Sequence, residues 1–146
     1  MSGKILIIDS NAHRRSALSQ AIQNSLYSCT AAKDIETAEY NGVEGVLLSA
    51  NTPDTIAKIR AQLHDANCPI LVLCHSNAGH DRADYFRAGA ADLIETTCDL
   101  REILSRLRYA MRRATAAREV ALRSGTTRAL GFAEANSTFA AKQMIH

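Results

Sequence analysis

The chain has 146 residues and a formal net charge of +2, and 47% of its residues are hydrophobic. This length and composition suit one globular domain with a terminal extension. No apolar run reaches the roughly 20 residues that a membrane-spanning helix needs, and the first residues show no signal-peptide pattern. We therefore expect a cytoplasmic protein with no membrane contact.

Charge is spread unevenly along the chain. Residues 1–100 carry eight Lys and Arg against twelve Asp and Glu, whereas residues 101–146 carry nine against three. This shift near residue 100 is the main sign of organisation along the chain. We expect a domain over residues 1–115, followed by a helical extension and linker tail over residues 116–146.

The cysteines argue against a disulfide framework or a zinc knuckle. None of them forms a C-x-x-C pair, and nothing else indicates secretion. We expect reduced thiols, mostly buried, at Cys29, Cys68, Cys74 and Cys98.

Short apolar runs recur along the chain and predict five strands. Fully apolar runs of this length suit parallel strands that are covered on both faces. They span residues 4–9, 27–32, 45–50, 69–74 and 91–96.

Between these runs, apolar residues recur at helical spacing. The stripes are Leu18, Ala21, Ile22 and Leu26; then Ile56, Ile59 and Leu63; then Ala83 and Phe86 before Gly89. The alternation of strands and helices also predicts a helix in residues 33–42, although apolar residues show no clear helical spacing there. A last helix is predicted over residues 99–123, with Asp99 as its N-cap and Ser124-Gly125 as its stop.

Alternating strands and helices predict an α/β fold with a doubly wound parallel sheet and helices on both faces. Such sheets place functional groups where their strands end. The candidate positions are Asp9 and Ser10, Ser49 to Thr52, Cys74 to Ser76, and Thr96 to Cys98.

Four patterns give the chain its resemblance to response-regulator receiver (CheY-like) domains over residues 3–115. They are "KILIID", "GVLLSANTPD", "PILVLC" and "AGAADLIETTCDLREIL", of which the last is the most specific. The resemblance implies a flavodoxin-like (βα)5 sandwich with strand order 2-1-3-4-5 and an extended C-terminal helix. It also implies a role in two-component signalling.

The resemblance fails at the positions that carry the family's chemistry. The family needs an acidic pair after strand one, an aspartate after strand three, a hydroxyl after strand four and a lysine after strand five, which together bind Mg²⁺ and accept a phosphoryl group. These positions correspond to Asp9 and Ser10, Ser49, Cys74, and Thr96. The aromatic switch-relay position corresponds to Leu93, and Pro53 supports the register.

These substitutions predict a degenerate receiver, or pseudo-receiver, without enzymatic activity. Asp9 alone binds a divalent ion weakly at best, and we expect it to be an N-cap or turn acceptor, so neither Mg²⁺ nor another cofactor is expected. Ser49 has no adjacent base to activate it. The spacing of Cys74, His75, His80 and Asp81 fits no standard metal site.

The last helix allows two interpretations. Alternating steps of four and three form a heptad seam, which favours a homodimer through residues 99–123. Alternatively, its first half packs on the sheet and the rest is a solvated linker. The seam consists of Leu100, Leu104, Leu107, Met111, Ala114, Arg118 and Ala121. The arginines of this helix surround it without interleaved aromatics, so nucleic-acid contact is not expected.

The resemblance also implies a docking surface on the fourth helix, fifth strand and fifth helix, with Tyr85, Arg87, Arg101 and Arg108 as partner-surface groups. We expect a phosphorylation-independent docking or dimerisation module whose partners are signalling proteins or its own output domain. The "ALRSGTTRALGFAEA" segment resembles linkers in diguanylate cyclases of the PleD type. The alternatives are a flavodoxin-like ligand-binding domain and a nucleic-acid binder using the basic helix.

Overall fold

The computed structural model describes residues 3–75 and 81–127. The chain divides into two compact units, Met1–Ala114 and Thr115–His146. The first unit contains the sheet, and residues 115–127 of the second are helical. The assignment of residues 1–115 as a domain and of residues 116–146 as a linker stays a prediction.

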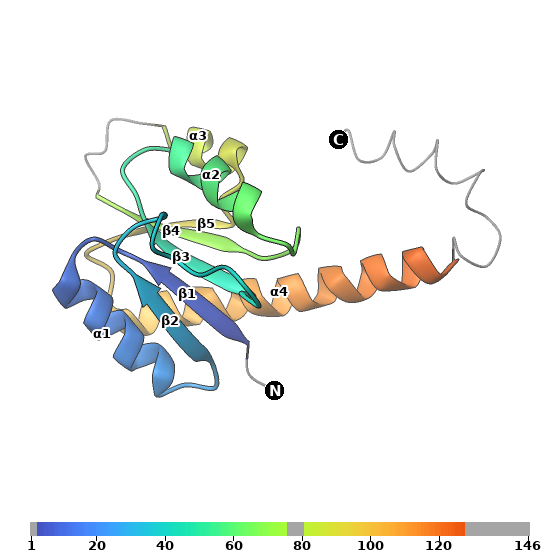
Figure 1. The fold of residues 1–146 in the computed structure, drawn as a ribbon, viewed down its shortest axis with the longest axis horizontal. Helices are drawn as coiled ribbons and strands as arrows, with labels where there is room; N and C mark the ends of the chain where they lie inside the picture. Colours follow the sequence, from blue (N-terminus) through green and yellow to red (C-terminus); the bar gives the residue numbers. More distant parts are fainter. Residues whose placement is uncertain (1–2, 76–80, 128–146) are drawn as a thin grey trace. The chain divides into compact units, whose positions relative to one another are not determined.

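All five predicted strands form one parallel sheet in the order β2-β1-β3-β4-β5 (Figure 1). The order confirms the doubly wound fold. The strands are β1 Lys4–Ile8, β2 Ser28–Ala32, β3 Gly45–Ser49, β4 Ile70–Cys74 and β5 Asp92–Glu95.

The described residues form four helices, one fewer than the alternation predicts. They are α1 Ala12–Gln23, α2 Asp54–Gln62, α3 Arg82–Ala88 and α4 Leu100–Thr127. The helix predicted in residues 33–42 is wrong, because this segment consists of bends, turns and irregular chain. There Asp34 Oδ1 accepts from the backbone N–H of Thr37 at 2.8 Å and from its hydroxyl at 2.7 Å, and such local bonds compete with a helix.

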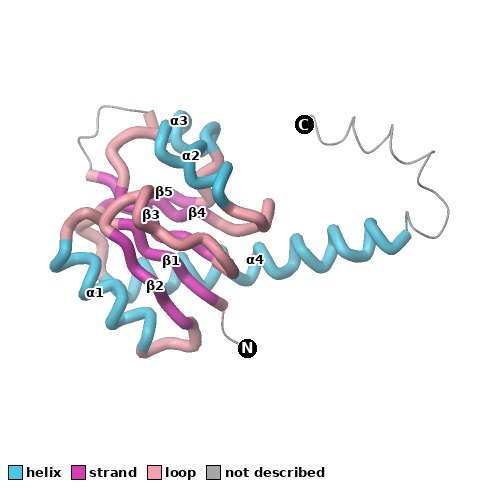
Figure 2. Tube along the Cα trace, in the orientation of Figure 1, coloured by secondary structure: helices cyan, strands magenta, loops and turns pink. Residues whose placement is uncertain are grey.

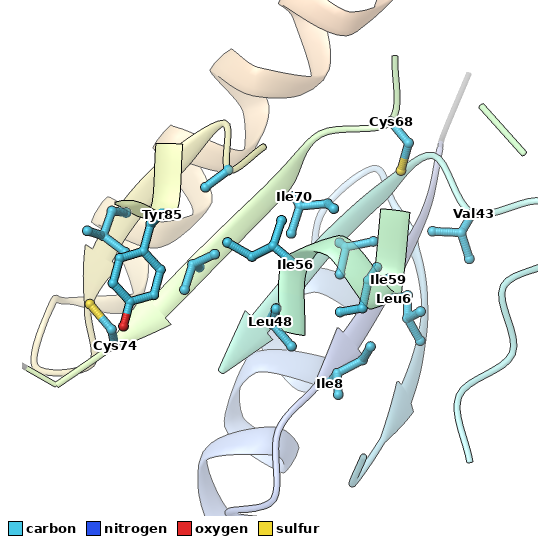
Figure 3. Packing of buried hydrophobic residues seen from close by; sticks show 14 residues of the cluster. Leu6, Ile8, Val43, Leu48, Ile56, Ile59, Cys68, Ile70, Cys74 and Tyr85 are labelled. Carbon is cyan, nitrogen blue, oxygen red and sulfur yellow. The ribbon is translucent and has the colours of Figure 1, made fainter. Parts of the chain in front are cut away.

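Helices cover both faces of the sheet (Figure 2), and each face has its own core. Since side chains alternate along a strand, Leu6 and Ile8 point to the face covered by α2 and α3, while Ile5 and Ile7 point to the other. Figure 3 shows the first of these cores, into which Tyr85 packs. Both faces of the central strands are therefore buried, as their uninterrupted apolar runs predict.

Two predicted helical stripes are partly wrong. Leu26 lies beyond the end of α1, and its side chain is 82% exposed. In α3 the buried residue is Tyr85, at 1% exposure, whereas Ala83 and Phe86 are exposed. A helix of only seven residues is too short for its spacing to define the inward face.

Helix α4 begins as predicted but ends later. Asp99 Oδ1 accepts from the backbone N–H of Arg101 at 2.8 Å, which is a capping bond. The stop predicted at Ser124-Gly125 is wrong, since the helix continues to Thr127. Glycine permits the left-handed turn that ends many helices but does not impose it.

Part of the predicted heptad seam lies inside the first unit. Leu107, Met111 and Ala114 are buried there, at 0%, 7% and 6% exposure. These three positions pack within their own domain, so the seam prediction is wrong for them.

Candidate functional site

Parallel pairing brings the ends of β1, β3, β4 and β5 to one edge of the sheet, here called the carboxyl edge. Ile8 pairs with Leu48, Ser49 with Leu73, and Cys74 with Glu95. The positions that the sequence predicts to be functional lie in these pairs or directly after them, namely Asp9, Ser49, Cys74 and Thr96. Asp9, Cys74 and Leu93 are buried, Ser49 and Thr96 are half-buried, and Ser10 is exposed.

Asp9 is the one buried charged residue of the described chain, at 1% exposure. Its Oδ2 accepts from Arg14 Nε at 2.6 Å, and its Oδ1 accepts from Arg14 Nη2 at 2.9 Å. The Asn11 backbone N–H also donates to Oδ1, at 2.9 Å. Asp9 is thus a turn acceptor, as expected, but the N-cap of α1 is Asn11, whose side chain accepts from the Arg14 N–H.

Arg14 connects the two positions that matter most in the receiver comparison. Arg14 binds the Asp9 carboxylate, and its Nη2 also donates to Ser49 Oγ at 3.2 Å. The Arg14 side chain is 24% exposed, while that of Asp9 is fully buried. A planar guanidinium therefore spans from the end of β1 to the end of β3, with geometry that suits two-point recognition of a carboxylate.

Sequence reasoning missed Arg14. The signal was present in "DSNAHRR", where an arginine follows Asp9 by five residues. If Asn11 caps the helix, Arg14 lies in its first turn and can reach back to the strand end. Without the cap position, the helix phase and hence the direction of this side chain stay undetermined.

The residues at this edge do not fit a Mg²⁺ ion. Mg²⁺ takes hard oxygen ligands in octahedral geometry. Here the one buried carboxylate, Asp9, has both oxygens engaged by Arg14 and the Asn11 N–H, and Ser10 and Ser49 add no charge. Within residues 3–75 and 81–127, no three His, Cys, Asp or Glu side chains lie together as a metal site. His80 lies outside the described residues.

The position of the family's lysine is occupied by a threonine that contacts a histidine. Thr96 Oγ1 lies 3.3 Å from His75 Nδ1, and the tautomer of the ring decides which atom donates. The Thr96 backbone N–H donates to the carbonyl of Cys74 at 3.0 Å. Thr96 thus ties β5 to β4 without bringing a fixed positive charge.

Beneath the edge, a tyrosine from α3 fills the space beside β4. Figure 3 shows the Tyr85 hydroxyl pointing toward the Cys74 thiol. Burial raises the pKa of the Cys74 thiol, and the charge of Arg82 partly opposes this effect. Burial also raises the pKa of the Tyr85 hydroxyl, with a smaller contribution from Cys74. Both groups therefore stay neutral near pH 7. Leu93, at the relay position, is buried in the same core at 3% exposure.

Three of the four predicted partner-surface residues are exposed, namely Arg87, Arg101 and Arg108. Arg87 forms an ion pair with Asp84 within α3. The prediction for Tyr85 is wrong, because its ring packs into the core between α3 and the sheet.

The strand order of the sheet is the one found in response-regulator receiver domains and in other flavodoxin-like folds. A response regulator from Thermotoga maritima superposes with a TM-score of 0.62 at 18% identity, covering 76% of this chain and 98% of that one. The NtrX protein from Brucella abortus, crystallised with ADP, gives a TM-score of 0.73 at 18% identity, covering 83% of this chain and 30% of that one. At such identities these likenesses show the fold alone.

Sequence relatives point the same way. The transcriptional regulatory protein PhoP of Escherichia coli K12 is 27% identical over 117 residues, covering 75% of this chain and 52% of that protein. The virulence regulator PhoP of Salmonella typhimurium is 26% identical over the same length. The chain spans about half the length of the curated relatives it matches. No family model matches.

Fold and sequence likeness together support a response-regulator receiver domain of two-component signalling, and the matched proteins are regulators. Nothing among the helices of residues 3–75 and 81–127 has the length and apolar character of a membrane span.

Proposed function

We propose that this chain is a regulatory receiver domain that works without phosphorylation, as a docking module for a signalling partner or for an output domain of its own protein. The observation that carries the proposal is the Asp9–Arg14–Ser49 arrangement. The arginine stands between the two residues that would have to hold the metal ion and accept the phosphoryl group.

Electrostatics argues against phosphoryl transfer at this edge. The reaction needs a divalent ion to neutralise the charge that develops on the transferred group. Freeing Asp9 for that ion would break a buried, two-point ion pair, and breaking such pairs costs several kcal/mol. Ser49 would then have to act as a nucleophile while Arg14, a donor, faces it in place of a base. No cofactor is therefore part of the proposal.

The direct test is intact-mass spectrometry after incubation with acetyl phosphate and Mg²⁺. We expect no stable adduct of one phosphoryl group. The matched control is the variant Ser10→Asp, Ser49→Asp, Thr96→Lys, Arg14→Ala, which restores the family's acidic and basic positions. If that variant does not fold, a separate receiver domain with intact acidic positions serves as the positive control for phosphorylation by acetyl phosphate. A phosphoryl adduct on the unmodified chain would refute the proposal.

The docking surface that we propose consists of α3, β5 and the part of α4 in the first unit. These are the fourth helix, fifth strand and fifth helix of the sequence comparison. Two large apolar side chains add to the arginines of this surface, Phe86 at 42% and Leu100 at 39% exposure. Replacing Arg87, Arg101 and Arg108 together by Glu is expected to abolish partner binding in a pull-down. The control is Lys33→Glu with Lys58→Glu, which reverses two exposed charges outside α3, β5 and α4.

For a homodimer through the last helix, the candidate contacts are exposed apolar side chains of the second unit. Val120 and Leu122 are 54% and 73% exposed in the second unit. If residues 115–127 pair with their copy, Val120→Glu shifts the molar mass measured by light scattering from dimer toward monomer. Unchanged mass in the variant would remove the dimer from the proposal.

A further inference from the structure

A groove of about 550 Å³ lies at the opposite, amino edge of the sheet. Its wall comes from the end of α2, the loop that leads into β4, the first residues of β5 and the part of α4 within the first unit. Three arginines line it, Arg60, Arg106 and Arg113, together with the aromatic ring of Tyr109. Its volume lies within the range of small-molecule sites, which is roughly 300–1,000 Å³.

Arg60 is held in place by neutral partners. Its Nη1 donates to the carbonyl of Cys68 at 2.9 Å and to that of Ala66 at 3.4 Å. These bonds fix the guanidinium at the groove wall but supply no negative charge. A guanidinium has five N–H donors, so Arg60 keeps donors for an anion.

Arg113 is likewise positioned without a carboxylate. Its guanidinium carbon lies 5.8 Å from the centre of the Tyr109 ring, within cation–π range. The Tyr109 side chain is 56% exposed, so part of this ring is open to a ligand. The ring orients the arginine while leaving its charge available.

Arg106 differs, because it is paired with acids. It contacts Asp92 at 3.1 Å and Glu102 at 2.8 Å. Asp92 is the one carboxylate among the groove-lining residues. The groove therefore carries an excess of positive charge, and that excess comes from Arg60 and Arg113.

We propose that this groove binds a phosphate-bearing small molecule, whose phosphate groups lie between Arg60 and Arg113. Planar guanidinium groups recognise phosphate through paired hydrogen bonds. A ligand with an aromatic ring, such as a nucleotide, gains a stacking surface on Tyr109, whereas an inorganic polyphosphate does not. The proposal is independent of phosphorylation at the carboxyl edge and goes beyond the docking function.

Isothermal titration of the full chain with ATP and with inorganic tripolyphosphate, both in EDTA, tests this site. We expect Arg113→Ala to weaken binding of both by about tenfold, as loss of a charge-assisted contact predicts. Arg112→Ala is the matched control, because it removes the same charge from the adjacent residue, which does not line the groove. Binding of that control should stay within about twofold of the unmodified chain.

The variant Tyr109→Leu distinguishes a nucleotide ligand from an inorganic polyphosphate. Because the ring also orients Arg113, this variant weakens both ligands. If the ring of a nucleotide stacks on Tyr109, ATP is weakened more than tripolyphosphate; if phosphate alone is recognised, both are weakened by the same factor. Either result supports the site. The absence of binding by both ligands at millimolar concentration overturns it. Equal weakening by Arg112→Ala and Arg113→Ala also overturns it, because that would show nonspecific charge attraction.

Discussion

The two edges of the sheet both gather arginines, but they use them in opposite ways. At the carboxyl edge, Arg14 is bound to the buried Asp9 carboxylate, so the charges cancel inside the domain. At the amino edge, Arg60 contacts backbone carbonyls and Arg113 contacts a ring, so positive charge remains available. The buried carboxylate at the edge where receivers carry their chemistry is thus paired with a cation, while the groove at the opposite edge keeps Arg60 and Arg113 for an anion.

The largest effect is expected beneath the carboxyl edge. Tyr85→Ala should destabilise the fold by about 4 kcal/mol, because it empties a fully buried aromatic site. Phe86→Ala, next to it and 42% exposed, is the control and should lose about 1 kcal/mol or less. Urea denaturation measures both. Equal losses would show that α3 presents a different face to the sheet.

Arg14→Met tests whether the ion pair between Asp9 and Arg14 stabilises the carboxyl edge of the sheet. We expect a loss of about 3 kcal/mol in the free energy of unfolding, since Asp9 is left buried without its cation. The double variant Asp9→Asn, Arg14→Met removes both charges and should recover part of that loss. A double-mutant cycle with no coupling would show that the ion pair does not hold this edge together.

Gly45→Ala tests how tightly α4 packs on the start of β3. A Cβ atom there would lie 2.6 Å from Met111 Sδ and 3.0 Å from Ile5 Cδ1. We expect a loss of about 2 kcal/mol from overpacking, measured by thermal unfolding. In a Met111→Ala background the same substitution should be nearly neutral, and an unchanged penalty there would contradict this contact.

The smallest effect is expected from the ion pair at the amino edge. Asp92→Asn should change stability by only about 0.5 kcal/mol, because the Arg106 and Asp92 side chains are 38% and 29% exposed and water screens their attraction. The same change should strengthen tripolyphosphate binding by removing the groove's carboxylate. Weaker binding in this variant would argue against an excess of positive charge as its basis.

The sequence by itself determined the fold class and the location of the family positions. Apolar runs and helical stripes are local patterns, and burial on two faces of a parallel sheet requires them, so the strands and four of the five predicted helices could be derived. The order of functional positions along the chain follows from the rule that parallel strands end at one edge. The same local reasoning failed for residues 33–42 and for α3, where short segments carry too little periodicity.

Only the tertiary structure decided which charges meet. Whether Arg14 reaches Ser49 depends on the phase of α1 set by the Asn11 cap and on a strand 35 residues away. The groove at the amino edge joins α2, β5 and α4, segments that no local pattern relates. Electrostatic pairing depends on distances in space, and those distances are fixed by packing after the elements have formed.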